Sequence, residues 1–361
     1  MGYTGCGMNV DFLIIGQGLA GSTLAVELLK RGRSVLVVDR QDGTGSTRIA
    51  AGLITPLTGK GMNPAWRQQH YLPKAVAFYH ALEKESGRKL YHSTPVVRVF
   101  ASERERDKWR GKKGELGQWA HELPELEGPF QNEFGGIEMP DGAWLDTLTF
   151  LHVVQDKLMD AGSWREAAFA EQDVSFVDGK VKWQDVVADK VILCQGAYGL
   201  KGVDGYQGWF SHVHHRSAKG EILNVWIDEL DEARRYHCNG WLAPREGGMW
   251  KAGANYDWKN MDAIPSDAGR SDVLNKLNTW VKLGDGKDVP MEVIGHEAGI
   301  RPIVRNSMPV VGFHPEMAEV GFFNGLGSKG SLMAPAVAEH FAAHLSGECD
   351  LDDELKLVQP G

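Results

Sequence analysis

The stretch IIGQGLAG, residues 14–21, decides the fold of this chain and reads Gly16-x-Gly18-x-x-Gly21. A short apolar run over residues 11–15 precedes it, and a helical pattern over residues 19–30 follows it. A second apolar run, residues 34–39, ends in an acid. A strand, a glycine-rich turn, a helix and a second strand within about 30 residues are typical of a βαβ unit. The sequence therefore predicts an α/β fold.

The three glycines and the acid after the second strand are typical of a dinucleotide site. Gly16 permits the tight turn, Gly18 lets the backbone approach a pyrophosphate, and Gly21 lets the helix pack on the strand. The first helical residues, Leu19 and Ala20, offer N–H groups and a partial positive charge to phosphates. Asp39 follows Gly16 by 23 residues, where a carboxylate accepts ribose hydroxyls and disfavours a 2′-phosphate. The alternative is a glycine-rich turn in an unrelated α/β unit, and the pattern does not separate FAD from NAD.

Composition limits the class of protein. The chain has 361 residues, of which 42% are hydrophobic, so we expect about two domains. A net charge of −9 disfavours a broad nucleic-acid or membrane surface. The four cysteines form no CxxC pair, which favours a reducing compartment over a disulfide scaffold. With no apolar run of about 18 residues and no signal-peptide pattern, we expect a cytoplasmic protein.

The pattern along the chain predicts a discontinuous arrangement. Helical and buried-strand patterns occupy both ends and the middle, whereas residues 206–257 carry short alternating segments with many aromatic side chains, typical of an antiparallel sheet. We expect a Rossmann-like cofactor domain interrupted by an inserted antiparallel substrate domain. The predicted ranges are 9–90, 141–205 and 295–350 for the cofactor domain, 91–140 and 206–294 for the substrate domain, and 1–8 and 351–361 for terminal extensions.

A second glycine-rich loop favours FAD over NAD. The stretch NGLGSKGSLMAPA, residues 324–336, leads into another helical pattern. A second helix N-terminus directed at a large flat ring suits an isoalloxazine, because its dipole stabilises negative charge on reduced flavin. A nicotinamide enzyme would instead continue with further β-α units.

Five stretches resemble the D-amino-acid-oxidase-type FAD oxidoreductases, which include glycine oxidase and sarcosine oxidase. In the family's order they are IIGQGLAGSTLAVELLKRGRSVLVVDR, STRIAAGLITP, KVILCQGAYG, AGIRPIVRNSMPVVG and NGLGSKGSLMAPAVAEHFA, and they cover the chain from about residue 10 to 345. The resemblance implies non-covalent FAD and hydride transfer from the carbon beside an amine. The FAD domain of the tRNA wobble-uridine modification enzyme belongs here too, and AAGLITPLTG is closer to that branch.

The resemblance also implies roles for individual residues. Gly16, Gly18, Gly21, Asp39 and Arg40 would hold the ADP half; Ser46, Thr47, Ala51 and Gly52 would lie along the ribityl chain and flavin edge; Val174 would contact adenine; Gly196 would close a strand end at the pyrophosphate; and Gly327, Ser328, Lys329 and Gly330 would line the pyrimidine side of the flavin. Arg301 corresponds to the arginine that holds the substrate carboxylate. Two positions depart from the family: Lys329 stands where a histidine or small residue is common, and Asn306 where an aspartate is common.

Each candidate catalytic residue has a structural alternative. Arg301 fits a carboxylate clamp but could form a structural salt bridge, and Lys329 could be a flavin-proximal cation or a solvent-facing lysine. Trp241 resembles an aromatic placed over the substrate, although aromatic residues in a sheet usually form core. His212, His214 and His215 have strand spacing but no carboxylate or cysteine nearby, so we expect no metal site and a role at a strand surface or pocket rim.

The function expected from the sequence is an FAD-dependent oxidation of a C–N bond in a small amine or amino acid. Oxygen or another electron acceptor would reoxidise the flavin, and we expect no membrane or nucleic-acid partner. The alternatives are a tRNA wobble-uridine modification enzyme, an NAD-dependent dehydrogenase and a non-catalytic FAD-binding module. Neither the substrate side chain nor the oligomeric state follows from the sequence.

Overall fold

The computed structural model describes residues 7–123, 126, 128–131, 133–228, 230–282, 286–304 and 308–357. Most of the expected N-terminal extension and the departure at Asn306 therefore lie outside the described residues. No helix in these ranges has the length and apolar character needed to cross a membrane.

The predicted βαβ unit forms the centre of the first sheet. Strand β1 (Met8–Ile15) lies parallel to β2 (Val35–Asp39), and α1 (Leu19–Lys30) connects them. Both strands are apolar on both faces, as buried parallel strands are. The sheet has the order β11-β2-β1-β14-β13-β12, and β21 pairs with both β14 and β20. Its other strands are β11 (Trp164–Glu166), β12 (Val174–Val177), β13 (Lys180–Trp183), β14 (Val186–Leu193), β20 (Val310–Phe313) and β21 (Val320–Asn324).

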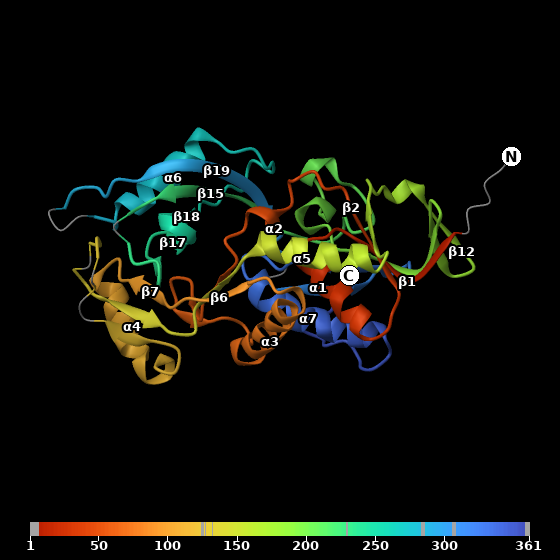
Figure 1. Ribbon diagram of the computed structural model, residues 1–361, viewed down its shortest axis with the longest axis horizontal. Coiled ribbons are helices and arrows are strands. Elements are labelled where there is room, and N and C mark those ends of the chain that lie inside the picture. Colours follow the sequence, from red (N-terminus) through yellow and green to blue (C-terminus); the bar gives the residue numbers. More distant parts are fainter. Residues whose placement is uncertain are drawn as a thin grey trace.

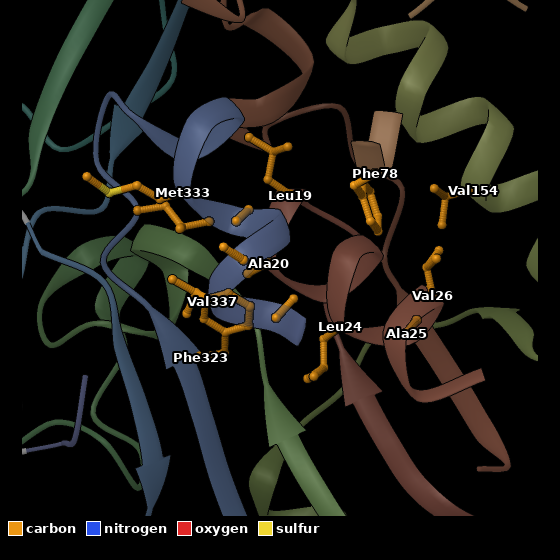
Figure 2. Packing of buried hydrophobic residues seen from close by; sticks show 14 of the residues in the cluster. Leu19, Ala20, Leu24, Ala25, Val26, Phe78, Val154, Phe323, Met333 and Val337 are labelled. Carbon is orange, nitrogen blue, oxygen red and sulfur yellow. The ribbon is translucent and has the colours of Figure 1, made fainter. Parts of the chain in front are cut away.

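Helices cover one face of this sheet and form its larger core. They are α1, α3 (Gln68–Ser86), α5 (Thr147–Asp160) and α7 (Gly330–Leu345). Figure 2 shows Leu24 of α1 and Val337 of α7 with Phe323 of β21, all of them fully buried. Alternate strand residues face the other way, so Leu13 and Leu36 join a second core with Trp183 and Phe210. Burial on both faces explains the continuous apolar runs in the sequence.

The second sheet is antiparallel except at one pair of strands. Its order is β19-β15-β18-β17-β16-β7-β9-β8, and β16 runs parallel to β7. Helix α6 (Asp267–Asn278) contributes Val273 and Leu277 to the core on one face of it. The strands are β7 (Val96–Val99), β8 (His121–Leu123), β9 (Gly136–Met139), β15 (Ala218–Trp226), β16 (Arg235–His237), β17 (Trp241–Pro244), β18 (Met249–Gly253) and β19 (Glu292–Arg301).

Shorter elements lie between and around the two large sheets. They are the helices α2 (Ser46–Ile49) and α4 (Glu103–Leu116), the strands β3 (Leu53–Ile54), β4 (Leu57–Thr58), β5 (Asn63–Pro64), β6 (Tyr91–Ser93) and β10 (Ala143–Leu145), and the 3-10 turns η1 (Glu171–Asp173), η2 (Gly196–Gly199), η3 (Val203–Gly205) and η4 (Glu246–Gly248). In Figure 1 the two sheets lie at opposite ends of the molecule's long axis, and α2 lies where they meet.

One sequence-based expectation about local structure was wrong. The segment 206–217, expected to open the antiparallel sheet, forms turns in which Phe210 is buried, and only an isolated bridge at His215 interrupts them. The predicted strand around His212 and His214 is therefore absent. Helix α6 begins at Asp267 because the Ser266 hydroxyl accepts from the Gly269 N–H (3.0 Å) and caps its first turn.

Candidate active site

A cavity of about 1650 Å³ runs through the junction between the two sheets. At one end it is lined by the carboxyl ends of β1 and β2, which is where ligands bind in open α/β sheets. At the other end it is lined by β15, β17 and β19 of the second sheet. It exceeds the 300–1000 Å³ usual for a drug-sized pocket, so it has room for a large cofactor together with a substrate.

The glycine-rich turn and Asp39 form the nucleotide end of the cavity. Gly16, Gly18, Leu19 and Ala20 line it, and the first N–H groups of α1 have no partner within the helix. The Asp39 carboxylate accepts the Gln17 N–H (2.6 Å) and so closes the turn against β2. Gly21 does not line the cavity; a β-carbon there would stand 1.9 Å from the Gly16 carbonyl oxygen. Its role is the close helix–strand packing expected from the motif.

The segment after β2 forms one side wall. Arg40 lines the cavity and lies 4.5 Å from the centre of the Tyr198 ring. Ser46 and Thr47 also line it, and the Thr47 hydroxyl accepts the Leu19 N–H (3.2 Å), which ties α2 to the start of α1. Val174 is not brought to this wall. Ala167, Ala168 and Phe169 stand there instead, directly after β11, because β11 is the strand that pairs with β2.

Three cations from the second sheet hold the backbone segment 49–54, which lines the cavity. Lys251 Nζ donates to the Ile49 carbonyl (2.8 Å), Arg245 Nη2 to that of Ala51 (3.2 Å), and Arg235 Nη2 to that of Ile54 (2.7 Å). Burial lowers the pKa of Arg245 to about 10 and that of Arg235 to about 9, so both are charged at neutral pH.

By holding these carbonyl groups, the three cations position the backbone at Ala51 and Gly52, which also line the cavity. Sequence analysis did not single them out. A lone basic residue inside an otherwise apolar strand, as in MWKAG over residues 249–253, is the signal that could have found Lys251; the two arginines lie in polar stretches of the sequence and carry no such signal.

The second glycine-rich loop lies at the N-terminus of α7, as the sequence predicted. Gly327, Ser328, Lys329 and Gly330 line the cavity, and so does Gly196. Asn324 joins the two parts, because its Nδ2 donates to the Gly196 carbonyl (2.7 Å). Burial lowers the pKa of the Lys329 ammonium, and no ion pair to it occurs among the described residues. Lys329 is therefore a cavity-lining cation rather than a freely solvated lysine.

Arg301 and Trp241 lie flat on the second sheet because glycines leave room for them. A β-carbon on Gly220 would stand 2.0 Å from Arg301 Nη2, and one on Gly253 would stand 2.4 Å from the Trp241 indole. Both side chains line the cavity. The Arg301 guanidinium lies 4.3 Å from the centre of the Tyr256 ring and donates to the Asn255 carbonyl (3.2 Å).

The Arg301 guanidinium is a cation without an anionic partner among the described residues. Burial lowers its pKa, and no described carboxylate pairs with it. A buried guanidinium without a counter-charge is unfavourable unless a ligand supplies one. The structural salt bridge considered as the alternative for Arg301 is absent from the described part of the chain.

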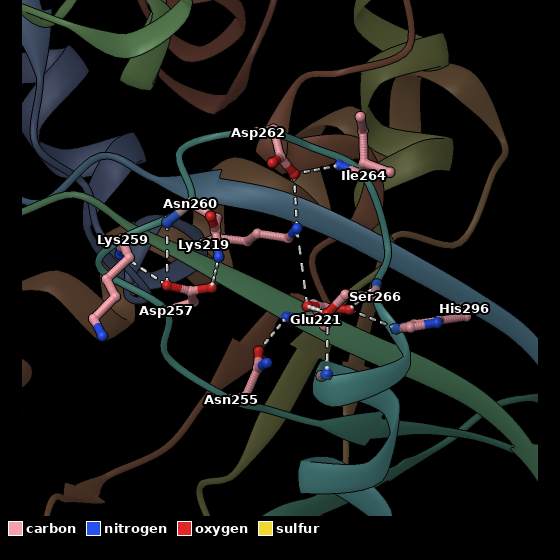
Figure 3. A network of polar contacts seen from close by, with 11 residues as sticks. Lys219, Glu221, Asn255, Asp257, Lys259, Asn260, Asp262, Ile264, Ser266 and His296 are labelled. Atoms are coloured by element: carbon pink, nitrogen blue, oxygen red, sulfur yellow. Dashed lines mark hydrogen bonds and ion pairs between the residues drawn. The ribbon is translucent and has the colours of Figure 1, made fainter.

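A buried polar network fixes the loop that carries Asn255 and Tyr256 (Figure 3). Glu221 of β15 accepts the backbone N–H and the hydroxyl of Ser266 (both 2.8 Å) and lies 2.8 Å from His296 Nε2. Its neighbour on the same face, Lys219, pairs with Asp262 (2.7 Å). The Glu221 N–H also donates to Asn255 Oδ1 (2.7 Å), so both ends of the loop are held against β15.

The three histidines of SHVHH do not line the cavity. His212 Nδ1 lies 3.2 Å from the Trp209 carbonyl, and the two ring nitrogens of His215 contact the Ser217 hydroxyl and the Lys201 carbonyl. No cluster of three potential metal ligands occurs among the residues that the structure describes. His212 and His215 therefore stabilise the turn that ends at Ser217.

The cavity fits FAD in shape and in chemistry. Two helix N-termini, those of α1 and α7, face it from different places, which suits a ligand with a pyrophosphate and a second electron-rich ring. Gly16, Gly18 and Gly327 leave their stretches of wall without side chains. Cys194 and Cys238 line the cavity too, and burial raises the pKa of both thiols, that of Cys238 to about 11. FAD held by these residues would supply two-electron redox chemistry.

Comparison with known proteins agrees with this geometry. The family model described as FAD dependent oxidoreductase matches residues 11–344. The chain is 31% identical to the glycine oxidase of Bacillus subtilis (strain 168) over 357 residues, covering 91% of this chain and 90% of that protein. The solved structure of the iminodiacetate oxidase of Chelativorans sp. BNC1 has a TM-score of 0.79 at 18% identity and covers 96% of this chain and 98% of that one.

The chain belongs to the family of FAD-dependent oxidoreductases that includes glycine oxidase. The resemblance found in the sequence, the Rossmann-like α/β fold and the FAD cofactor are thereby confirmed. The chain is also 22% identical to the tRNA 5-methylaminomethyl-2-thiouridine biosynthesis bifunctional protein of Marinobacter nauticus, over 91% of this chain, and it spans about half (54%) of that protein's length.

Proposed function

We propose that this protein oxidises the C–N bond of a small amine or amino acid that carries a carboxylate. The observation that carries the proposal is Arg301, a partly buried guanidinium without a described carboxylate partner, in the wall of the same cavity as both glycine-rich loops. Its paired N–H groups match a carboxylate in geometry and charge. The similarity to a glycine oxidase supports a substrate of this kind.

In this proposal the protein positions the substrate and excludes water. Arg301 holds the carboxylate, Trp241 covers the apolar part of the substrate, and Lys329 stabilises negative charge near the flavin ring. The neutral amine needs no strong base, because hydride leaves the adjacent carbon once the substrate is oriented. Oxygen or another acceptor takes the electrons afterwards.

We further propose that FAD is held non-covalently and that the chain is divided as the sequence predicted. In this division the cofactor domain comprises 9–90, 141–205 and 295–350, and the substrate domain comprises 91–140 and 206–294, except that residues 295–301 of β19 pair within the second sheet and Phe210 packs in the core of the first sheet. The raised pKa values of Cys194 and Cys238 support non-covalent binding, since a protonated thiol is a poor nucleophile.

The test is an absorbance spectrum of the purified protein, followed by anaerobic addition of amines and amino acids. Flavin bands that bleach with one class of carboxylate-bearing amine support the proposal. Arg301→Met should weaken binding of that amine by roughly 2–4 kcal/mol, the scale of losing a buried charged contact, and Arg301→Lys should recover part of it. A protein that binds FAD but is bleached equally well by amines without a carboxylate would contradict it.

A second candidate is the same oxidation on an aminomethyl-linked carboxymethyl group of tRNA. The similarity to the Marinobacter nauticus protein favours it, and the net charge of −9 disfavours it. Adding tRNA that bears this group to the same anaerobic assay distinguishes the two candidates.

A further inference from the structure

The cavity continues well beyond Arg301 and Trp241. Pairing across the second sheet places Trp241 beside His237 of β16, and His237 beside Arg98 of β7. All three line the cavity. Neighbouring strands are about 4.8 Å apart, and three strand steps separate Gly220 of β15, beneath Arg301, from His237, which gives about 14 Å. A substrate the size of glycine leaves most of this length unused.

The middle of this extension offers an unused polar atom. His237 Nδ1 is buried and has no hydrogen-bond partner among the residues that the structure describes. Buried polar atoms are normally paired, so an unpaired one in a cavity wall marks a place for a ligand or a water molecule. Arg98, the next residue along, is already neutralised: it pairs with Glu105 and donates Nη1 to the Gly59 carbonyl (2.9 Å).

The far end of the extension is lined by cations that have no described carboxylate partner. Lys60, Arg104 and Lys108 line it, and none of them forms an ion pair within the described ranges. Two carboxylates also line this part: Glu105, which pairs with Arg98, and Glu133, which is exposed, as the three cations are. The local charge is therefore positive although the chain as a whole is acidic, and such a charge favours an anionic group.

We infer that the natural substrate is elongated and carries a second anionic group, a carboxylate or a phosphate, at its far end. Arg301 holds the first carboxylate, the arm passes His237, and the second anion lies among Lys60, Arg104 and Lys108. The inference rests on the proposed function, because it takes Arg301 as the anchor of one end. It goes further by naming the substrate class.

The test measures binding of linear carboxylic acids to the FAD-loaded protein by flavin absorbance and tryptophan fluorescence. Succinate, adipate, sebacate and longer dicarboxylates are compared with monocarboxylates of equal length and with ω-phosphono acids. Dissociation constants should fall roughly tenfold for doubly anionic ligands once they span the distance, and not for monocarboxylates. The phosphono acids show which of the two anions is preferred.

Matched variants locate the second anion. Lys108 Nζ donates to the Lys60 carbonyl (3.0 Å) and Lys112 Nζ to that of Gly61 (3.2 Å), so both lysines tie α4 to the same loop, but only Lys108 lines the cavity. Lys60→Ala/Lys108→Ala should remove the advantage of the long dicarboxylates, whereas Lys112→Ala should keep it.

Three outcomes would overturn the inference: no advantage for doubly anionic ligands, an advantage that does not depend on length, or equal loss in Lys112→Ala. Failure of the proposed function has a different signature. In that case even short monocarboxylates bind without depending on Arg301.

Discussion

Arg301 rests on Gly220: the two residues lie on paired strands, and a β-carbon on Gly220 would stand 2.0 Å from the guanidinium Nη2. The arginine can lie flat on the sheet because Gly220 has no side chain. Gly220 is two residues from Ala218, which is the direct pairing partner of Arg301. Because the clash involves the far end of a flexible side chain, the sheet can absorb a methyl group there while the guanidinium cannot stay in place.

Gly220→Ala should therefore separate binding from stability. We expect affinity for a carboxylate ligand to fall at least about tenfold, which is about 1.4 kcal/mol, with a change in the free energy of unfolding within about 1 kcal/mol. Ligand titration and thermal melting measure the two effects. Gly111→Ala, where a β-carbon meets nothing within 4 Å, is the control and should leave affinity unchanged. A large loss of stability with unchanged affinity would contradict the prediction.

Glu221 should matter far more than its neighbour Asp262. Glu221→Gln replaces a buried charge that accepts from Ser266 and contacts His296, so we expect a loss of about 3 kcal/mol of unfolding free energy and weaker carboxylate binding. Asp262 is half-exposed, so Asp262→Asn should lose less than about 1 kcal/mol. Denaturant unfolding gives both values. Equal losses in the two variants would show that burial is not the cause.

Lys329 should set the redox potential of the bound flavin. Lys329→Met removes a partly desolvated positive charge from the cavity wall, so we expect the potential to fall on the order of 30 mV, about 1.4 kcal/mol for two electrons. Sulfite binding should weaken in parallel. Spectroscopic titration against a reference dye measures the potential, and Lys329→Arg should preserve it. An unchanged potential would place Lys329 away from the ring.

His237 should make the fold sensitive to acid. Burial, together with Arg98 and Arg235, lowers its pKa to about 3 in the folded state, against 6.5 unfolded. Between these two pH values the unfolded chain binds one proton more than the folded chain. The free energy of unfolding is therefore fully retained above about pH 6.5 and falls by about 1.4 kcal/mol for each pH unit below it. His237→Gln should reduce this slope.

Denaturant unfolding of FAD-loaded protein between pH 7 and pH 5 measures the effect of His237. The exposed His214 provides the control, since His214→Gln should keep the parental slope. If His237→Gln also keeps the parental dependence of unfolding free energy on pH, groups other than His237 cause the acid sensitivity.

Much of the cofactor half was predictable from the sequence because its signals are local. The turn at Gly16, the helix from Leu19 and the acid at Asp39 occupy one continuous stretch, and apolar runs identify strands that are buried on both faces. The second loop, at Gly327, was readable for the same reason.

The tertiary structure decided what depends on distant residues. Strand pairing, not sequence spacing, brings Gly220 under Arg301 and places Lys251, Arg245 and Arg235 against the carbonyls of residues 49–54. Residues 167–169, and not the expected Val174, line the cavity wall, because β11 rather than β12 pairs with β2. Periodicity reports which residues are buried but not which strands become neighbours, so the sequence determined the fold class and the cofactor, while only tertiary pairing built the substrate end of the cavity.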